Sequence, residues 1–164
     1  MRWSAALLCL CAACSRPPPP SSAPLPPDIQ MDRVTMKQFR GSQTRVTVTA
    51  PHLEMMRSSG DFTMVDASVR LEAQGITVQA PQVAGNTGSG VLEGSGGLTL
   101  TTSDGVTGTT ERARFDKALG PEGGATSDAG VHLEHPDFTL DATGFQVDFA
   151  SGTASFDQPV TKSR

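Results

Sequence analysis

The sequence predicts an all-β fold in which about four stacked repeats of roughly 30 residues make two sheets that face each other. Three observations favour this fold. The chain is rich in valine, threonine and glycine, apolar and polar residues alternate along short stretches, and one pattern recurs at a nearly constant interval. Alternation of period two is typical of strands with one buried face, and a recurring pattern of this length is typical of stacked repeats.

The recurring pattern is an alternating stretch that ends on an anchor residue. The stretches cover residues 45–50, 75–80, 105–110 and 137–142, and their anchors are spaced by 30, 30 and 32 residues. Positions two and four residues before an anchor share its strand face, whereas the intervening positions are polar. The sequence therefore predicts one buried face and one hydrated face. The anchors and their inward companions are Ala50 with Val46 and Val48, Ala80 with Ile76 and Val78, Thr110 with Val106 and Gly108, and Ala142 with Phe138 and Leu140.

After each anchor the apolar positions change parity. A change of parity at a fixed place predicts a bulge or corner that turns the strand while the same side stays inward. Pro51 and Pro81 stand at this corner, where a missing backbone donor is tolerated. The apolar residues three and five positions beyond the anchors are Leu53, Met55, Val83, Ala113, Phe115, Phe145 and Val147.

Each unit then continues to a turn and a returning strand. The sequence predicts turns at residues 58–60, 86–88, 120–123 and 151–152, and returning strands at 65–71, 98–100 and 131–133. Residues 29–39 add a leading strand. Five small inward residues are expected to leave room between the sheets, namely Ala50, Ala80, Gly85, Gly108 and Ala113.

The first 13 residues are predicted to be an export signal. Met1 and Arg2 give a positive start, and residues 3–13 form an apolar stretch that is too short for a membrane span, which needs about 20 residues. Two small residues then precede Cys14, an arrangement that resembles the lipobox of bacterial lipoproteins. The resemblance implies cleavage before Cys14 and acylation of that cysteine. A plain secretory signal and an uncleaved anchor are the alternatives.

A proline-rich tether and one folded body follow the signal. Residues 14–27 hold Cys14 and seven of the 12 prolines, a composition that favours extended polyproline II and builds no core. Residues 28–164 form a body of 137 residues, an ordinary size for one domain. The body has no cysteine, so we expect no disulfide in it. The net charge of −4, without a basic patch, argues against nucleic acid as a partner.

Over residues 28–164 the sequence resembles the LptC family, the periplasmic component of the lipopolysaccharide exporter, and the wider group of OstA-like domains. The resemblance lies in the recurring strand–alanine–strand–glycine unit, seen at 47–50 and 77–80, and in the stretches 103–105 and 111–116. It implies an open β-jelly roll of two sheets, shaped like a folded taco, with lipid acyl chains between the sheets. In that family the energy comes from a partner ATPase, so no reaction and no cofactor are expected in this domain.

The trough of such a fold would be lined by the inward side chains of the repeats. Each buried methylene contributes about 0.8 kcal/mol, so a few per acyl chain hold a lipid. The same residues also fit an ordinary packed core. The predicted lipid-binding residues are Val46, Val48, Leu53, Ile76, Val78, Val83, Phe115, Phe138, Leu140 and Phe145.

The resemblance also implies partners and a location. The partners are lipopolysaccharide, the inner-membrane exporter subunits and a soluble periplasmic bridge protein. Exposed edge strands near residues 32–39 and 152–160 are candidates for strand addition, although Pro159 and the charged tail 162–164 offer the alternative that the last edge is capped. The expected location is the periplasmic side of the inner membrane, through the lipid anchor, with the outer membrane as the alternative.

No group of residues in the body predicts catalysis or a metal site. His132 and His135 have opposite strand parity, so they point to opposite faces, whereas zinc needs three or four converging ligands. The glycine-rich stretch 88–97 is followed by a strand rather than by the helix that a phosphate loop needs. The competing hypothesis is a non-catalytic structural or assembly lipoprotein with a packed β-solenoid or OstA-like core.

Overall fold

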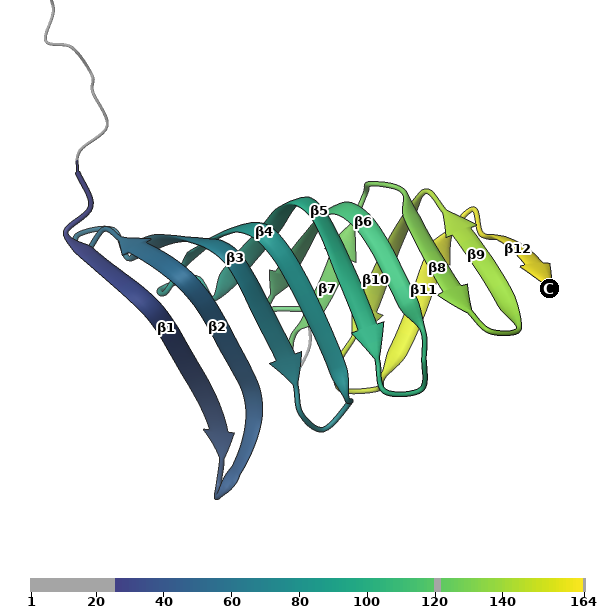
Figure 1. Cartoon of the computed structure of the whole chain (residues 1–164), viewed down its shortest axis with the longest axis horizontal. Coiled ribbons are helices and arrows are strands. Elements are labelled where there is room, and N and C mark those ends of the chain that lie inside the picture. The colour runs from purple at the N-terminus through teal and green to yellow at the C-terminus, as the bar shows by residue number, and fades with distance from the viewer. Residues whose placement is uncertain (1–25, 120–121, 164) are drawn as a thin grey trace, which may run out of the picture.

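The computed structural model describes residues 26–119 and 122–163, and this part of the chain is all β. The twelve strands belong to one sheet. Figure 1 shows that this sheet is open, twisted and folded over on itself. The described residues contain no helix long and apolar enough to cross a membrane. The predicted signal peptide and Cys14 lie outside them. The strands are β1 (Ile29–Arg40), β2 (Gln43–Met55), β3 (Asp61–Leu71), β4 (Ile76–Asn86), β5 (Val91–Thr102), β6 (Thr107–Asp116), β7 (Gly124–Ser127), β8 (Val131–His135), β9 (Phe138–Ala142), β10 (Gly144–Asp148), β11 (Thr153–Asp157) and β12 (Val160–Ser163).

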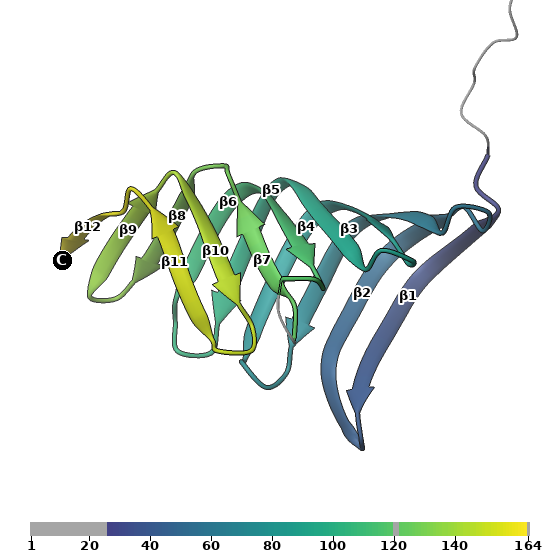
Figure 2. The ribbon, with the colours of Figure 1, turned by 180° about the vertical axis from the view of Figure 1, so that it is seen from behind.

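Antiparallel pairing links β1 to β6 in chain order. After β6 the sheet continues along two separate paths. On one side of β6, residues 107–110 pair with β8 and residues 114–116 pair with β7. We call the half that continues through β8, β9 and β12 the front sheet, and the half that continues through β7, β10 and β11 the back sheet. Figure 2 shows the back sheet from behind. The two sheets face each other and are joined through the bend of β1–β6, which confirms the predicted open two-sheet jelly roll.

The bend lies where the sequence predicts a corner. Pro51 and Pro81 are exposed there, and the ladder between β4 and β5 is interrupted between Gln79 and Gln82. Left-handed backbone at Arg33 (φ 54°) and Asp66 (φ 50°) turns β1 and β3 at the same level. Because these interruptions change the strand parity, the same side of the chain stays inward on both sheets, as predicted.

The densest packing lies along the inside of the bend. The anchors Ala50 and Ala80 are buried there, and Leu53 keeps only 1% of its exposure. Small and large side chains together fill the narrow space where the two sheets join. The buried cluster consists of Ala50, Leu53, Met64, Ala67, Ala80, Val83 and Leu98.

Glycine makes a tight turn between β2 and β3, where one is predicted. The Gly60 backbone is left-handed (φ 75°), and its amide donates to the Met56 carbonyl at 2.8 Å. A Cβ on Gly60 would lie 2.6 Å from Thr87 Oγ1 in the turn after β4. The successive turns of the back sheet therefore pack directly against one another. Turns also follow β4 and β10 as predicted.

The last repeat departs from the predicted unit. The corner pattern predicts one strand that runs through the bend after Ala142, but β9 belongs to the front sheet and β10 to the back sheet. The predicted return at 131–133 is β8, which pairs only within the front sheet among the described strands. Since the two halves of β6 serve different partners, the later chain crosses between sheets at residues 128–130, at Thr143 and at 158–159.

The chain ends on two sheet edges. The sequence predicts one last edge strand near 152–160, but β11 closes the back sheet and β12 closes the front sheet. Pro159 lies in the crossing between them, so its interpretation as a cap on a single last edge is wrong. The predicted leading strand is confirmed as β1, which forms the first edge by pairing with β2.

Candidate binding trough

The inner faces of the two sheets carry rows of apolar side chains. Cross-strand partners share a face, so the strand register joins them into rows that run across each sheet. On the front sheet the row is Met36, Val48, Val69, Val78, Leu100, Gly108, Leu133 and Leu140. On the back sheet it is Ile29, Met55, Phe62, Gly85, Leu92, Phe115, Ala125 and Val147. We call the space between these rows the trough.

Burial falls from the bend towards the free rims of the sheets. Of the ten predicted trough residues, Leu53 and Val83 lie in the fully buried cluster at the bend. The structure thus divides the predicted set into a packed spine and a more accessible part. The remaining eight are half-buried: Val46, Val48, Ile76, Val78, Phe115, Phe138, Leu140 and Phe145.

The predicted set omits the most exposed apolar side chains of the inner face, which lie on β1. Met31 is 40% exposed and Met36 is 38% exposed. Met31 lies opposite Leu53 and Met36 lies opposite Val48, so both share the inward side of β2. Alternation within the predicted leading strand carries this signal, once the parity change at Arg33 is allowed for. Because β1 is an edge strand, its inward side chains stay open to solvent.

Aromatic rings gather near the rims. Phe115 stacks with Phe149 on the back sheet, with ring centroids 6.0 Å apart and planes inclined by 27°. Phe149 follows β10 and is also absent from the predicted set, yet it continues the alternation of Phe145 and Val147. On the front sheet the His135 imidazole covers the Phe138 ring at 5.0 Å.

The small inward residues do not leave the open space that the sequence predicts. A Cβ on Gly85 would lie 2.6 Å from both Phe62 Cζ and Leu92 Cδ2. A Cβ on Gly108 would lie 2.6 Å from Leu133 Cδ2. Large side chains on the adjacent strands already occupy the volume above these glycines, so the expectation of free room there is wrong. The accessible apolar surface lies nearer the rims instead.

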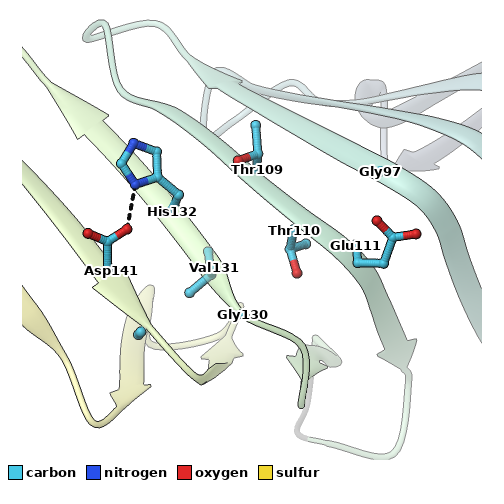
Figure 3. Close-up of a pocket in the computed structure, with 9 residues that line it drawn as sticks. Gly97, Thr109, Thr110, Glu111, Gly130, Val131, His132 and Asp141 are labelled. Atoms are coloured by element: carbon cyan, nitrogen blue, oxygen red, sulfur yellow. Dashed lines mark hydrogen bonds and ion pairs between the residues drawn. The ribbon is translucent and has the colours of Figure 1, made fainter.

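A histidine–carboxylate pair lies on the outer face of the front sheet. His132 Nδ1 is 2.6 Å from Asp141 Oδ1, and this hydrogen bond raises the pKa of His132 above its ordinary value. The pair lines a hollow of about 410 Å³. Figure 3 shows the pair on one side of this hollow and Glu111 across from it. Across residues 26–119 and 122–163, no group of three or more His, Cys, Asp or Glu side chains is placed to hold a metal ion.

Comparison with known proteins identifies the fold. No family model matches the chain, and no curated protein matches it. The structure is similar to the crystal structure of LptH, the LptA homologous periplasmic component of the conserved lipopolysaccharide transport device from Pseudomonas aeruginosa. The TM-score is 0.54 at 9% sequence identity, over 73% of this chain and 93% of that chain. The likeness shows that this chain has the open β-jelly roll of LptA-like proteins.

Proposed function

We propose that this chain is a non-catalytic, membrane-anchored periplasmic component of the lipopolysaccharide export machinery. It binds lipopolysaccharide between its two sheets and passes it along a bridge towards the outer membrane. The observation that carries the proposal is the trough, whose apolar rows stay half-buried between the bend and the rims. An amphiphile that crosses an aqueous compartment must shield its acyl chains, and each methylene buried in the trough contributes about 0.8 kcal/mol.

Two likenesses support this function. The fold is similar to that of LptH, whose description is a periplasmic component of a lipopolysaccharide transport device. The repeat pattern of residues 28–164 resembles the LptC family. Both likenesses favour a role in lipopolysaccharide transport.

In-cell photocrosslinking from Leu140 tests the cargo. Leu140 belongs to the inner row of the front sheet, whereas the neighbouring Asp141 faces outward and contacts His132. We expect lipopolysaccharide adducts from a photoprobe at Leu140 and none from a probe at Asp141. The absence of an adduct at Leu140, in a protein shown to be folded and lipidated, contradicts the proposal.

The proposed anchor is an acyl group on Cys14, after removal of residues 1–13. The proline-rich residues 15–27 then hold the body 28–164 away from the inner membrane. Labelling cells with a fatty-acid analogue tests the anchor. Cys14→Ser should abolish the label and release the protein from the membrane, whereas Cys9→Ala, which keeps an apolar residue outside the lipobox, should keep both. A labelled Cys14→Ser variant contradicts the anchor.

The proposed partners bind by strand addition at the free edges. We propose that β1 meets the inner-membrane exporter subunits and that β11 and β12 meet the soluble bridge protein. Deletion of residues 158–164 removes β12 and leaves β11 in place. We expect this deletion to weaken crosslinking to the bridge protein and to leave the exporter contact unchanged. Undiminished crosslinking to the bridge protein contradicts the assignment of this edge.

A second candidate is a structural or assembly lipoprotein without cargo. The buried cluster at the bend favours it, because Leu53 and Val83 already fill their part of the interior. This candidate predicts no lipid adduct at Leu140. The photocrosslinking experiment therefore separates the two functions.

A further inference from the structure

An ion-pair cluster joins the rim of the front sheet to the rim of the back sheet. Arg40 and Arg45 flank the β1–β2 turn at the front rim, whereas Glu122 lies between β6 and β7 at the back rim. Arg40 Nη1 donates to Glu122 Oε1 at 2.8 Å, and Arg45 Nη2 donates to Glu122 Oε2. The arginines are 82 and 77 residues from Glu122 in the chain. Together with the bend, this contact closes a ring around the trough.

Two cations share one anion in this cluster. Hydrogen bonding by Arg45 lowers the pKa of Glu122, and the same bond raises the pKa of Arg45. Among the described residues, Glu122 is the carboxylate that lies within ion-pair distance of either guanidinium. One positive charge is therefore left in excess at the rim. The Arg40 side chain is 72% exposed, and ion pairs so open to water are weakly held.

Apolar side chains of the trough lie beside the two arginines. Met36 is 38% exposed and precedes Arg40 by four residues on the same side of β1. Val46 follows Arg45 and belongs to the half-buried lining of the trough. A cationic rim next to an apolar lining matches the two parts of an anionic amphiphile. Acyl chains that enter past β1 would bring an anionic headgroup to Arg40 and Arg45.

We propose that Arg40 and Arg45 bind the phosphate headgroup of the amphiphile that occupies the trough, and that Glu122 holds this site until the headgroup displaces it. Guanidinium groups bind phosphate through paired, charge-assisted hydrogen bonds. A phosphate monoester carries more than one negative charge at neutral pH, so it competes well with one carboxylate. Headgroup binding then separates the two rims. The inference rests on the proposed function, because it assumes that the trough receives acyl chains.

Binding of dodecyl phosphate, below its micelle concentration, to the full chain tests the site. We expect Arg40→Gln with Arg45→Gln to weaken binding about tenfold and Glu122→Gln to strengthen it about threefold, since the charge-assisted bonds are lost or freed. The matched control is Arg114→Gln, which breaks an exposed ion pair with Glu93 within the back sheet and should leave the affinity unchanged. Equal affinities for all four proteins overturn the proposal.

Two further probes define the ligand. Dodecyl maltoside has the same chain and an uncharged headgroup, and we expect it to bind all four proteins alike. Inorganic phosphate has the charge without the chain, and we expect it to bind far more weakly than dodecyl phosphate. If inorganic phosphate binds as tightly, the site takes free anions and the assignment to a lipid headgroup is wrong.

The distance between the rims tests the displacement of Glu122. Spin labels at Ser42 and Lys117, introduced through an unnatural amino acid, report on the front and back rims; both residues are exposed. We expect dodecyl phosphate to lengthen this distance in the wild-type chain, and Glu122→Gln to lengthen it without ligand. A distance that stays constant in both cases contradicts the displacement.

The two experiments test the proposed cargo and the proposed headgroup site separately. If no lipopolysaccharide adduct forms at Leu140 but the dodecyl phosphate results hold, the proposed cargo is wrong and the headgroup site stands for another anionic amphiphile. If the adduct forms but the variants bind dodecyl phosphate alike, the cargo stands and the headgroup site is wrong.

Discussion

Leu53 occupies the tightest place in the molecule, where β2 leaves the bend. Its side chain is 1% exposed and belongs to the buried cluster of β2–β5. Leu53→Ala should reduce the free energy of unfolding by about 2–5 kcal/mol, because it removes apolar contacts and leaves a cavity. Urea denaturation followed by circular dichroism measures the change. Val65→Ala, on an exposed position of the neighbouring strand, is the control and should cost well under half as much. Equal losses would mean that the bend is not the core.

Gly108 has no side chain, yet the space above it is already filled by a neighbouring leucine. Its Cβ position is 2.6 Å from Leu133 Cδ2, so Gly108→Val should destabilise the protein by about 1–3 kcal/mol through overpacking. The control is Gly130→Ala, whose nearest neighbour would be a carbonyl oxygen at an ordinary 3.7 Å. Thermal unfolding compares the two. If Gly108→Val is as stable as the control, the space above Gly108 is free, as the sequence predicts.

Single residues also mark the limit of what the sequence can predict about the site. The inward positions of Val48, Val78 and Leu140 follow from alternation alone, since parity fixes the face of a strand. The same rule also predicts the inward position of Phe149. No local pattern predicts the contact of Glu122 with Arg40, because it joins positions 82 residues apart on different strand pairs.

At the scale of elements, β1 is attached to β2 partly through a histidine. His52 Nδ1 lies 2.9 Å from Asp32 Oδ1 across the ladder, and Asp32 and Glu54 raise the pKa of His52 by hydrogen bonding. A raised pKa in the folded state gives stability that is present below the unfolded pKa of about 6.5 and is lost as the pH rises through the folded value. In the pair between β8 and β9, the hydrogen bond with Asp141 also raises the pKa of His132, so its contribution to stability is likewise lost as the pH rises.

We therefore expect the melting temperature to fall between pH 6 and pH 8.5. Asp32→Asn and Asp141→Asn should each flatten this dependence, because they remove the carboxylate that favours the imidazolium. Asp148→Asn is the control; backbone hydrogen bonding lowers the pKa of Asp148, so its carboxylate stays ionised throughout the range. A wild-type melting temperature that is constant over this interval contradicts the role of the histidine pairs.

The elements that the sequence predicts best are those that run through the bend. Pro51 and Pro81, with apolar residues that change parity beyond them, place the corners of β2 and β4. The separation of β9 from β10 has no such mark, because Thr143 carries no signal that distinguishes a continuous strand from a crossing. Only the pairing of β6 with two different strands makes that crossing necessary.

For the whole molecule, the proposed function implies that an amphiphile bound in the trough stabilises the fold. A ligand at 100 times its dissociation constant contributes about 2.7 kcal/mol if it binds only the native state. We expect lipopolysaccharide to raise the melting temperature of the full chain. Leu140→Asp should abolish this shift by placing a charge on the lining, whereas Thr99→Asp, at an exposed position of β5, should retain it. Equal shifts in both variants would place the ligand outside the trough.

The division of pairing at β6 also bears on the order in which the molecule assembles. From β1 to β6 each strand pairs with its neighbour in the chain, so short loops suffice to build that half. Beyond β6 the chain crosses between the sheets three times, and β10 must find β7 across two intervening strands. Contacts between distant segments form more slowly, because loop closure costs entropy first. The N-terminal hairpins should therefore gain amide protection earliest. The C-terminal part after β6, which crosses between the sheets, should be the last to form and the first to open.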